Sequence, residues 1–318
     1  MMKKFMRFIS LLAAIATLTS CHHKDLYYDD VELRDIKIVF DWRNAPDADP
    51  TSMEVFLFDS SASNEIRFNF PNRIGGSIEL EPGQYSGLGI NSDISDWAHT
   101  RNIDNIETFE IYTDEVSELS AYNLDPTSLP KARGAAEERI VATPKMLWSG
   151  REDSITVTDT PGQKVITFYP KEDVCHYTVD VINVKNIENI QGIDVDGTIS
   201  GMAESYLHGK HKPTDTSATM PFNLSVNDNK DSLHSEFLTF GESSETANAH
   251  ILSLYIIMTD GAKLHYTFDV TSQIHNAPDP QHVHIVVSGI ELPKTIETGE
   301  GFVPEVNDWQ SEHVNIMM

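Results

Sequence analysis

Apolar and polar residues alternate along much of this chain with a period of two. Residues 66–70 and 264–270 alternate strictly, and residues 36–42 alternate with one interruption at Val39. Such alternation is typical of β-strands that bury one face. More continuous apolar runs, typical of strands in the middle of a sandwich, occupy residues 53–58, 165–169, 177–184, 251–258 and 282–287.

Clusters of Pro, Gly, Asn and Asp separate these runs and predict turns. They lie at residues 44–47, 81–83, 160–162, 259–261 and 276–280. Many short strands joined by turns indicate an all-β fold built from sandwiches. Helical periodicity is scarce: residues 92–106 predict a short helix or a loop, and residues 132–138 predict a helical turn. Residues 202–229 are rich in Ser, Thr, Asp and Pro and predict a long loop.

The chain is long enough for two domains. Its 318 residues exceed the ~100–200 residues of one typical domain. A polar, turn-rich stretch lies at residues 148–162, and a new series of strands begins at Lys164. We therefore predict an N-terminal β-sandwich at residues 34–162 and a C-terminal β-sandwich at residues 163–318.

The first residues have the pattern of an export signal. Lys3, Lys4 and Arg7 precede an apolar run at residues 8–18, and small residues follow it. A basic region, a short apolar region and small residues before a cleavage point are typical of a signal peptide. The apolar run is well short of the ~20 residues that span a bilayer. We predict that residues 1–20 are a signal peptide.

A cysteine stands directly after this segment. Leu18-Thr19-Ser20-Cys21 resembles the bacterial lipobox, in which the cysteine thiol is acylated and the chain is cut just before it. We predict lipidation of Cys21, with residues 21–33 as a tether. Each buried methylene of an acyl chain contributes about 0.8 kcal/mol to membrane binding. The alternative is an ordinary signal peptide followed by an incidental cysteine.

The charge of the chain excludes one class of partner. The net charge is -26, and it is more negative still without the cations of the leader. A surface this acidic repels phosphate backbones and anionic lipid headgroups. We therefore expect no nucleic-acid partner, and we expect the lipid rather than charge to hold the protein at the membrane.

Residues for catalysis are not evident. With Cys21 acylated, Cys175 has no partner for an internal disulfide, and its apolar neighbours predict a small buried side chain. The sequence contains no Gly-rich phosphate loop, no serine nucleophile elbow and no H-E-x-x-H motif. We therefore expect no enzyme activity, no catalytic residues and no cofactor.

Two other patterns suggest binding sites, and each has a simpler explanation. His282 and His284 share one face of a strand, close to Asp279 and His275; a metal-dependent hydrolase is a minor alternative, and a solvated strand face with no metal is the favoured interpretation. The Asp-Val-Asp-Gly sequence at residues 194–197 resembles the start of a calcium loop, but a β-hairpin with an Asp-Gly turn explains it more simply.

Short motifs relate the chain to a known family. Leu80-Glu81-Pro82-Gly83-Gln84-Tyr85 resembles the hairpin of transthyretin-like sandwiches, with Tyr85 returning to the core. Together with residues 39–46 and 306–309, the chain resembles the fimbrillin-like lipoproteins of Bacteroidetes over essentially its whole length. The resemblance implies two tandem transthyretin-like β-sandwich domains in an outer-membrane, cell-surface lipoprotein. It also implies a fimbrial subunit, tip or anchor in cell adhesion.

The resemblance also implies a mechanism of assembly. Shaft subunits of that family lose an N-terminal strand to an arginine-specific protease, and a neighbour's strand fills the groove. Arg34 and Arg43 flank a strand here and are candidate processing sites; the alternative is that both are plain surface residues. The C-terminal residues that alternate on one face are either a donor strand or the last strand of the second sandwich; they are Val314, Ile316 and Met318.

The partners implied are other fimbrial subunits, in a homo- or hetero-polymer, the outer membrane through the lipid, and a host or bacterial surface receptor. The alternative function is a surface glycan-binding lipoprotein for nutrient capture, because aromatic rings stack on sugar faces. Trp97, in the polar stretch at residues 95–99, is the candidate ligand contact for that alternative.

Overall fold

A computed structural model describes residues 33–60, 65–160, 162–243, 249–294 and 308–314. Cys21, Ile316 and Met318 lie outside these residues. The described chain is all-β, as predicted, with one short α-helix, α2 (Thr271–His275), among its elements. Short 3-10 helices lie between strands: η1 (Trp42–Asn44), η2 (Ser92–Asp96), η3 (Pro126–Ser128), η4 (Ile187–Asn189) and η5 (His208–Lys210).

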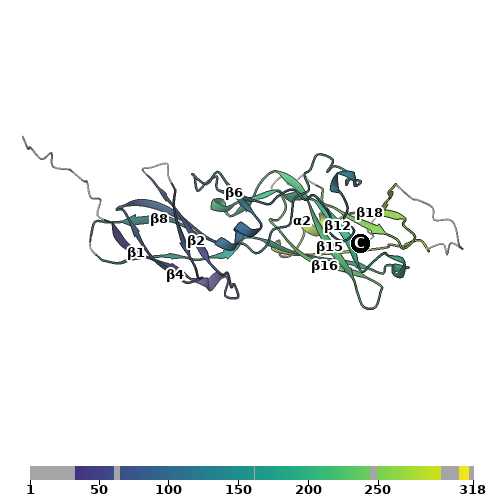
Figure 1. The fold of residues 1–318 in the computed structure, drawn as a ribbon, viewed down its shortest axis with the longest axis horizontal. Coiled ribbons are helices and arrows are strands. Elements are labelled where there is room, and N and C mark those ends of the chain that lie inside the picture. The colour runs from purple at the N-terminus through teal and green to yellow at the C-terminus, as the bar shows by residue number, and fades with distance from the viewer. Residues whose placement is uncertain (1–32, 61–64, 161, 244–248, 295–307, 315–318) are drawn as a thin grey trace, which may run out of the picture. The chain divides into compact units, whose positions relative to one another are not determined.

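Two sheets in the first part of the chain pack face to face (Figure 1). A three-stranded sheet has the order β4–β1–β9, and a five-stranded sheet has the order β10–β8–β5–β2–β3. Inward-facing side chains of both sheets share one buried core, as the alternation along their strands predicts. The strands are β1 (Arg34–Phe40), β2 (Met53–Asp59), β3 (Glu65–Phe70), β4 (Gly75–Leu80), β5 (Gly83–Asn91), β8 (Trp148–Val157), β9 (Lys164–Phe168) and β10 (Lys171–Glu172).

A larger sheet dominates the second part. It has eight strands in the order β19–β11–β16–β15–β12–β17–β18–β20. Its apolar side chains form a second core, which also receives Phe56 and Leu88 from the outer face of the five-stranded sheet. The strands are β11 (Cys175–Ile182), β12 (Asp194–Ala203), β15 (Ser217–Val226), β16 (Leu233–Thr239), β17 (Ile251–Ile257), β18 (Lys263–Asp269), β19 (His282–Ser288) and β20 (Gln310–Val314).

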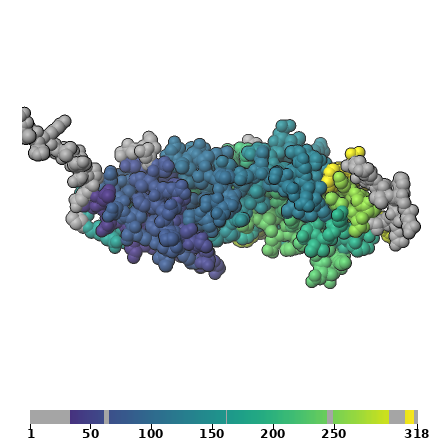
Figure 2. Space-filling view, in the orientation of Figure 1, coloured from purple at the N-terminus to yellow at the C-terminus, as the bar shows by residue number. Residues whose placement is uncertain are grey.

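A four-stranded sheet joins segments that are far apart in sequence. Its order is β14–β13–β7–β6, formed by β6 (His99–Arg101), β7 (Glu110–Tyr112), β13 (Ser205–Leu207) and β14 (Lys212–Pro213). The segment after β7 continues along the second part of the chain, where the backbone N–H groups of Ala121 and Tyr122 donate to the Asp196 carboxylate at 2.9 and 3.0 Å. Figure 2 shows this blue-teal segment reaching the yellow C-terminal strand.

The predicted boundary between residues 162 and 163 therefore separates segments that pair with each other. β9 follows that boundary, yet it pairs in parallel with β1, with Ile38 opposite Ile166. β7 precedes the boundary, yet it pairs with β13. The described residues from Arg34 onward form one compact unit. The division into two domains stays a prediction.

All the strands predicted from alternation and apolar runs are present. Three other predictions are wrong. Residues 148–162 are not a turn-rich stretch, since the ten-residue β8 occupies residues 148–157. Residues 202–229 are not a loop, since β13 and the ten-residue β15 lie within them. Residues 194–197 are not a hairpin turn, since they open β12, and Asp196 is fully buried there.

The Pro-Gly turn after β4 connects two different sheets. β4 and β5 lie in separate sheets, so residues 80–85 form an arch across the sandwich rather than a hairpin. Tyr85 returns to the core as predicted, with 3% of its surface exposed, and its hydroxyl donates to the Glu81 carbonyl at 3.0 Å. A tyrosine that bonds the backbone four residues earlier stabilises such crossings between sheets.

Within the part of the chain that the structure describes, no helix has both the length and the apolar character needed to cross a bilayer.

Candidate functional site

Strand β1 occupies the middle of the three-stranded sheet. It pairs antiparallel with β4 on one side and in parallel with β9 on the other. Ile36, Ile38 and Phe40 point into the core and are 1%, 0% and 4% exposed. Gly89 of the facing sheet leaves room for the Phe40 ring, because a Cβ at that position would lie 2.9 Å from it. β1 therefore fills a slot that both sheets are built around.

The two predicted processing sites lie at the two ends of β1. Arg34 is its first residue, and only 11% of the Arg34 side chain is exposed. Arg43 lies beyond its last residue, in η1, and 65% of its side chain is exposed. The Arg43 guanidinium donates to the Asp41 carboxylate at 2.5 Å and lies 4.9 Å from the centre of the Tyr169 ring. Arg43 is thus the more accessible of the two, and whether either is cleaved stays a prediction.

Strand β20, close to the C-terminus, lies at the edge of the eight-stranded sheet. It pairs in parallel with β18, with Phe268 opposite Val314. Its residues 310–313 are exposed, and Val314 packs partly against the larger core. Side-chain hydrogen bonds also join the two strands, between His265 and Ser311 at 3.1 Å and between Thr267 and His313 at 3.0 Å. Val314 therefore lies in a last strand, while its role as a donor stays a prediction.

The remaining predicted site residues do not converge. Trp97 directly follows η2 and is half-buried against the larger core, and its contact with a ligand stays a prediction. His282 and His284 have exposed side chains that face different carboxylates, Asp279 at 2.9 Å and Asp180 at 2.7 Å. The two histidines are thus held by separate hydrogen bonds.

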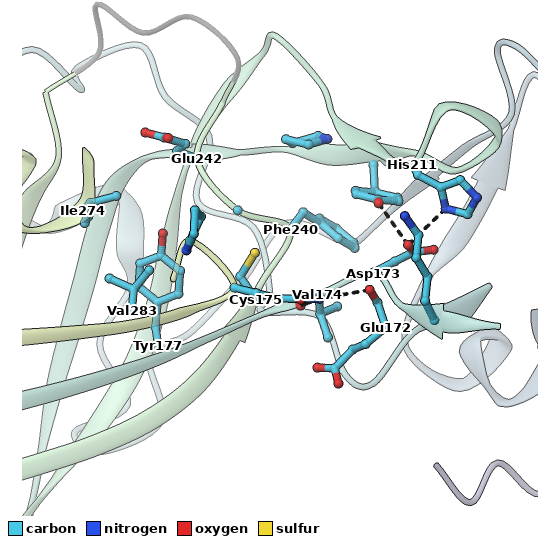
Figure 3. Close-up of a pocket in the computed structure, with 16 residues that line it drawn as sticks. Glu172, Asp173, Val174, Cys175, Tyr177, His211, Phe240, Glu242, Ile274 and Val283 are labelled. Carbon is cyan, nitrogen blue, oxygen red and sulfur yellow. Dashed lines mark hydrogen bonds and ion pairs between the residues drawn. The ribbon is translucent and has the colours of Figure 1, made fainter. Parts of the chain in front are cut away.

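A cavity of about 360 Å³ lies beside the start of β11 (Figure 3). Cys175, Tyr177 and Phe240 form part of its apolar wall, and Asp173 and Glu242 are among its polar lining residues. The sequence pattern gives no sign of this cavity, because its lining comes from segments between residues 171 and 283.

The Asp173 carboxylate is buried in the wall of this cavity. It accepts hydrogen bonds from the Ser149 hydroxyl, from Tyr206 at 3.1 Å and from His211 at 3.1 Å. Ser149 belongs to β8 and Tyr206 to β13, so the carboxylate joins the five-stranded sheet to the four-stranded sheet. A buried charge needs such donors to be tolerated.

His208, next to this network, has a different environment. Its side chain is fully buried, and its Nδ1 lies 3.6 Å from the Asp173 carboxylate, too far for a hydrogen bond. Burial lowers the pKa of His208 to about 4, so the imidazole is neutral near pH 7. His208 packs against Phe109 and Tyr206, and it thus serves as an aromatic core residue.

The Cys175 thiol in the cavity is a poor nucleophile. Burial, followed by the charges of neighbouring carboxylates, raises its pKa to about 12. The thiolate is the reactive form of cysteine. Cys175 was predicted to be a small buried side chain; it is partly buried and lines the cavity.

We expect native Cys175 to resist alkylation. Relative to a thiol of pKa 9, a pKa of about 12 lowers the thiolate fraction at pH 8 by about a thousandfold. The measurement is the rate of iodoacetamide labelling in a Cys21→Ser variant, which leaves Cys175 as the one thiol. The same variant in denaturant is the control, and it should label quickly. Equal rates in the two conditions would contradict the assignment.

Comparison with known proteins gives one matching family and one relative that matches over nearly its whole length. The family model described as a domain of unknown function, DUF5119, matches residues 20–223. A protein of Bacteroides ovatus assigned as the fimbrium anchoring subunit Fim4B is 24% identical over 345 aligned positions, and the alignment covers 96% of this chain and 96% of that protein.

Two solved structures share the fold. One, assigned as an adhesin from Bacteroides ovatus, matches with a TM-score of 0.63 and 21% identity, over 84% of this chain and 96% of that chain. The other, the fimbrial anchor protein Mfa2 from Porphyromonas gingivalis, matches with a TM-score of 0.52 and 14% identity, over 81% of this chain and 91% of that chain.

Proposed function

The chain belongs to the DUF5119 family, and from this premise we propose that it is an accessory subunit that anchors a fimbrium to the bacterial outer membrane. The resemblance to fimbrial proteins of Bacteroidetes is confirmed, since the full-length relative is a fimbrium anchoring subunit. That relative belongs to a family of structural proteins rather than enzymes. The function is therefore docking, without bond-making chemistry by this chain.

The observation that carries the anchoring role is the position of β1. The strand is bonded on both sides, by β4 and β9, and its apolar side chains are buried. The chain before β1 leads back to Cys21. In this proposal Cys21 is acylated and β1 stays paired between β4 and β9. The strand therefore connects the lipid-bearing segment to the folded protein. A shaft subunit would instead lose this strand.

The position of the arginines supports retention of β1. Arg34 lies within a paired strand with little exposed side chain, and a protease needs access to an extended, unpaired backbone. Arg43 is exposed, but Asp41 and Tyr169 hold its guanidinium. We propose that neither bond is cut during maturation, so the lipid stays attached.

Strand β20 is the segment we propose for contact with the next subunit. An edge strand presents one row of unpaired backbone groups, which favours pairing with another chain. Residues 310–313 bury little of their side chains, so detaching β20 exposes little apolar surface. In this proposal the neighbour's groove receives the side chains of Val314, Ile316 and Met318. We also propose that the two parts of the chain are tandem transthyretin-like sandwiches.

The mass of the mature N-terminus tests the anchoring role. We expect the protein isolated from outer membranes to begin at an acylated Cys21, and we expect Cys21→Ser to release it from the membrane fraction. Arg43→Gln is the matched control and should leave the mature N-terminus unchanged. A mature chain that starts at Asp35 or Asn44 would instead identify a polymerising subunit and overturn the anchoring proposal.

A further inference from the structure

Three side chains from separate elements converge at one place in the second part of the chain. Glu242 follows β16, His250 directly precedes β17, and His275 is the last residue of α2. Their ligand atoms all lie within 4.8 Å of one another. The Glu242 carboxylate oxygen Oε2 lies 3.1 Å from His275 Nε2 and 3.5 Å from His250 Nε2. Ligand atoms bonded to one tetrahedral zinc ion are separated by about 3.3 Å, so these distances fit a shared cation.

A hydrogen bond fixes which ring nitrogen of His250 faces the other two side chains. His250 Nδ1 lies 3.1 Å from the Ser200 carbonyl oxygen, to which only a protonated nitrogen can donate. The side chain is 1% exposed, so the surrounding residues hold the ring in place. His250 Nε2 is therefore the nitrogen that faces the Glu242 carboxylate, at 3.5 Å, which is beyond an ordinary hydrogen bond. In metal-binding histidines the hydrogen bond of one ring nitrogen likewise orients the other toward the ion.

A β-bulge positions the Ser200 carbonyl for this contact. The register of β12 against β15 shifts between Ile199 and Met202. Gly201, in the bulge, has a φ of +78°, and a Cβ there would lie 2.8 Å from His250 Nδ1. The Ser200 hydroxyl accepts the Ile251 N–H at 3.0 Å, which fixes the backbone beside His250. Bulges of this kind often orient groups next to functional sites.

The helix that carries His275 is tied to the same backbone. The His250 N–H donates to the Thr271 hydroxyl at 2.9 Å, and Thr271 is the first residue of α2. The Asp269 carboxylate accepts the Thr271 N–H at 3.0 Å. His250 and His275 are thus positioned by one connected set of hydrogen bonds, which resembles the outer-shell support of metal ligands.

We propose that Glu242, His250 and His275 bind one divalent transition-metal ion of the zinc class. Two imidazoles and one carboxylate are a donor set that zinc uses with a water as fourth ligand, whereas calcium and magnesium prefer oxygen donors alone. The Glu242 and His275 side chains are 41% and 30% exposed, so an ion and its water have access from solvent.

A bound ion at this site joins the end of β16, the start of β17 and the end of α2. The sequence interpretation placed His275 with His282 and His284 and expected no metal; the structure instead places His275 with Glu242 and His250. Metal binding to the folded state alone raises stability, so the ion would act as a clamp. Glu242 also lines the cavity beside β11 (Figure 3).

Zinc titration of the full-length chain tests this site. The protein is purified without a histidine tag, in a background where His22 and His23 are glutamine, and is stripped with chelator. Calorimetry with ZnCl₂ should give one site per chain, and zinc should raise the melting temperature. Glu242→Gln and His275→Gln each should weaken binding at least about tenfold, the lower range for loss of even an outer-shell partner, and should remove the thermal shift.

The control variants are His282→Gln and His284→Gln, which remove exposed imidazoles of the same chemistry. They should bind zinc as the parent protein does, and MgCl₂ should give no thermal shift in any variant. Glu242 and His275 are partly exposed, so their glutamine variants should fold with unchanged circular dichroism. The proposal is overturned if the parent protein binds no zinc in this titration, or if both test variants bind it as tightly as the controls do.

Discussion

Replacing Ile38 with alanine should lower the free energy of unfolding by about 2–5 kcal/mol, the range for a fully buried large aliphatic side chain. Ile38 lies at the centre of β1 and is completely buried, opposite Ile166 on β9. Truncation leaves a cavity between the two sheets, because strands on both sides fix the backbone of β1. The measurement is chemical denaturation of the full-length chain.

Val165→Ala is the matched control for this prediction. Val165 lies on β9, opposite Lys37, and 53% of its surface is exposed. Removing its methyl groups takes little apolar surface out of the core, so we expect a loss below about 1 kcal/mol. Equal losses at Ile38 and Val165 would show that β1 does not occupy the slot.

This difference matters for the proposed anchor. If the lipid is attached at Cys21, any load on the fimbrium passes through β1. Extracting the strand breaks two ladders at once, with β4 and with β9, and exposes the side chains of Ile36, Ile38 and Phe40. A destabilised β1 should therefore shed protein from the membrane, even when Cys21 is acylated.

Strand prediction succeeded where the apolar residues themselves repeat along the chain. Along β18, Leu264, Tyr266 and Phe268 are buried, and the period of two follows directly from the pleat. The same reasoning placed β1 and β3. These strands can be predicted from sequence because each carries its own alternating pattern.

The failures have physical reasons too. β15 was predicted to be a loop because its segment is rich in polar residues and contains Pro221, yet Met220, Phe222 and Leu224 alternate along it and are buried. Pro221 lies opposite Thr198, next to the β12 bulge, where a missing N–H is tolerated. A stricter test for alternation would have identified this strand.

Residues 194–197 were misassigned because turn chemistry was considered without its partners. Asp196 is buried in β12, where the N–H groups of Ala121 and Tyr122 satisfy its carboxylate. Those donors lie over seventy residues earlier in the chain. Likewise, Glu242, His250 and His275 belong to segments after β16, before β17 and at the end of α2, and they meet only in the folded chain. Local sequence carries no record of such contacts.

Acidification should destabilise the protein through its buried histidines, among them His208 and His265. Burial lowers the pKa of His208 and of His265 to about 4, whereas an unfolded histidine titrates near 6.5. Between these values the unfolded chain binds more protons, so stability rises with pH. This contribution is fully present above pH 6.5 and is lost as the pH falls toward 4.

The expected loss between pH 7.5 and pH 5 is about 2 kcal/mol for each of the two histidines. Other groups act in the same window: His234, whose pKa is raised by its hydrogen bond to Asp180, gains stability on acidification and opposes the loss. The slope of the parent protein alone cannot separate the loss due to the buried histidines from the gain due to His234. Comparison of variants separates them.

The variants are His208→Met, whose flexible side chain fills the apolar site, and His265→Gln, whose amide can replace the bond to Ser311. Each should flatten the dependence of unfolding free energy on pH between 5 and 7.5 by about 2 kcal/mol. His99→Gln removes a half-exposed imidazole that contacts Asp114 and is the control for losing a histidine ring at the surface. A variant slope equal to that of the parent would mean that these rings reach solvent and bind protons in the folded state. For His265, proton binding in the folded state would also weaken the contact between β18 and β20. Strand β20 is the one on which the proposed contact with the next subunit depends.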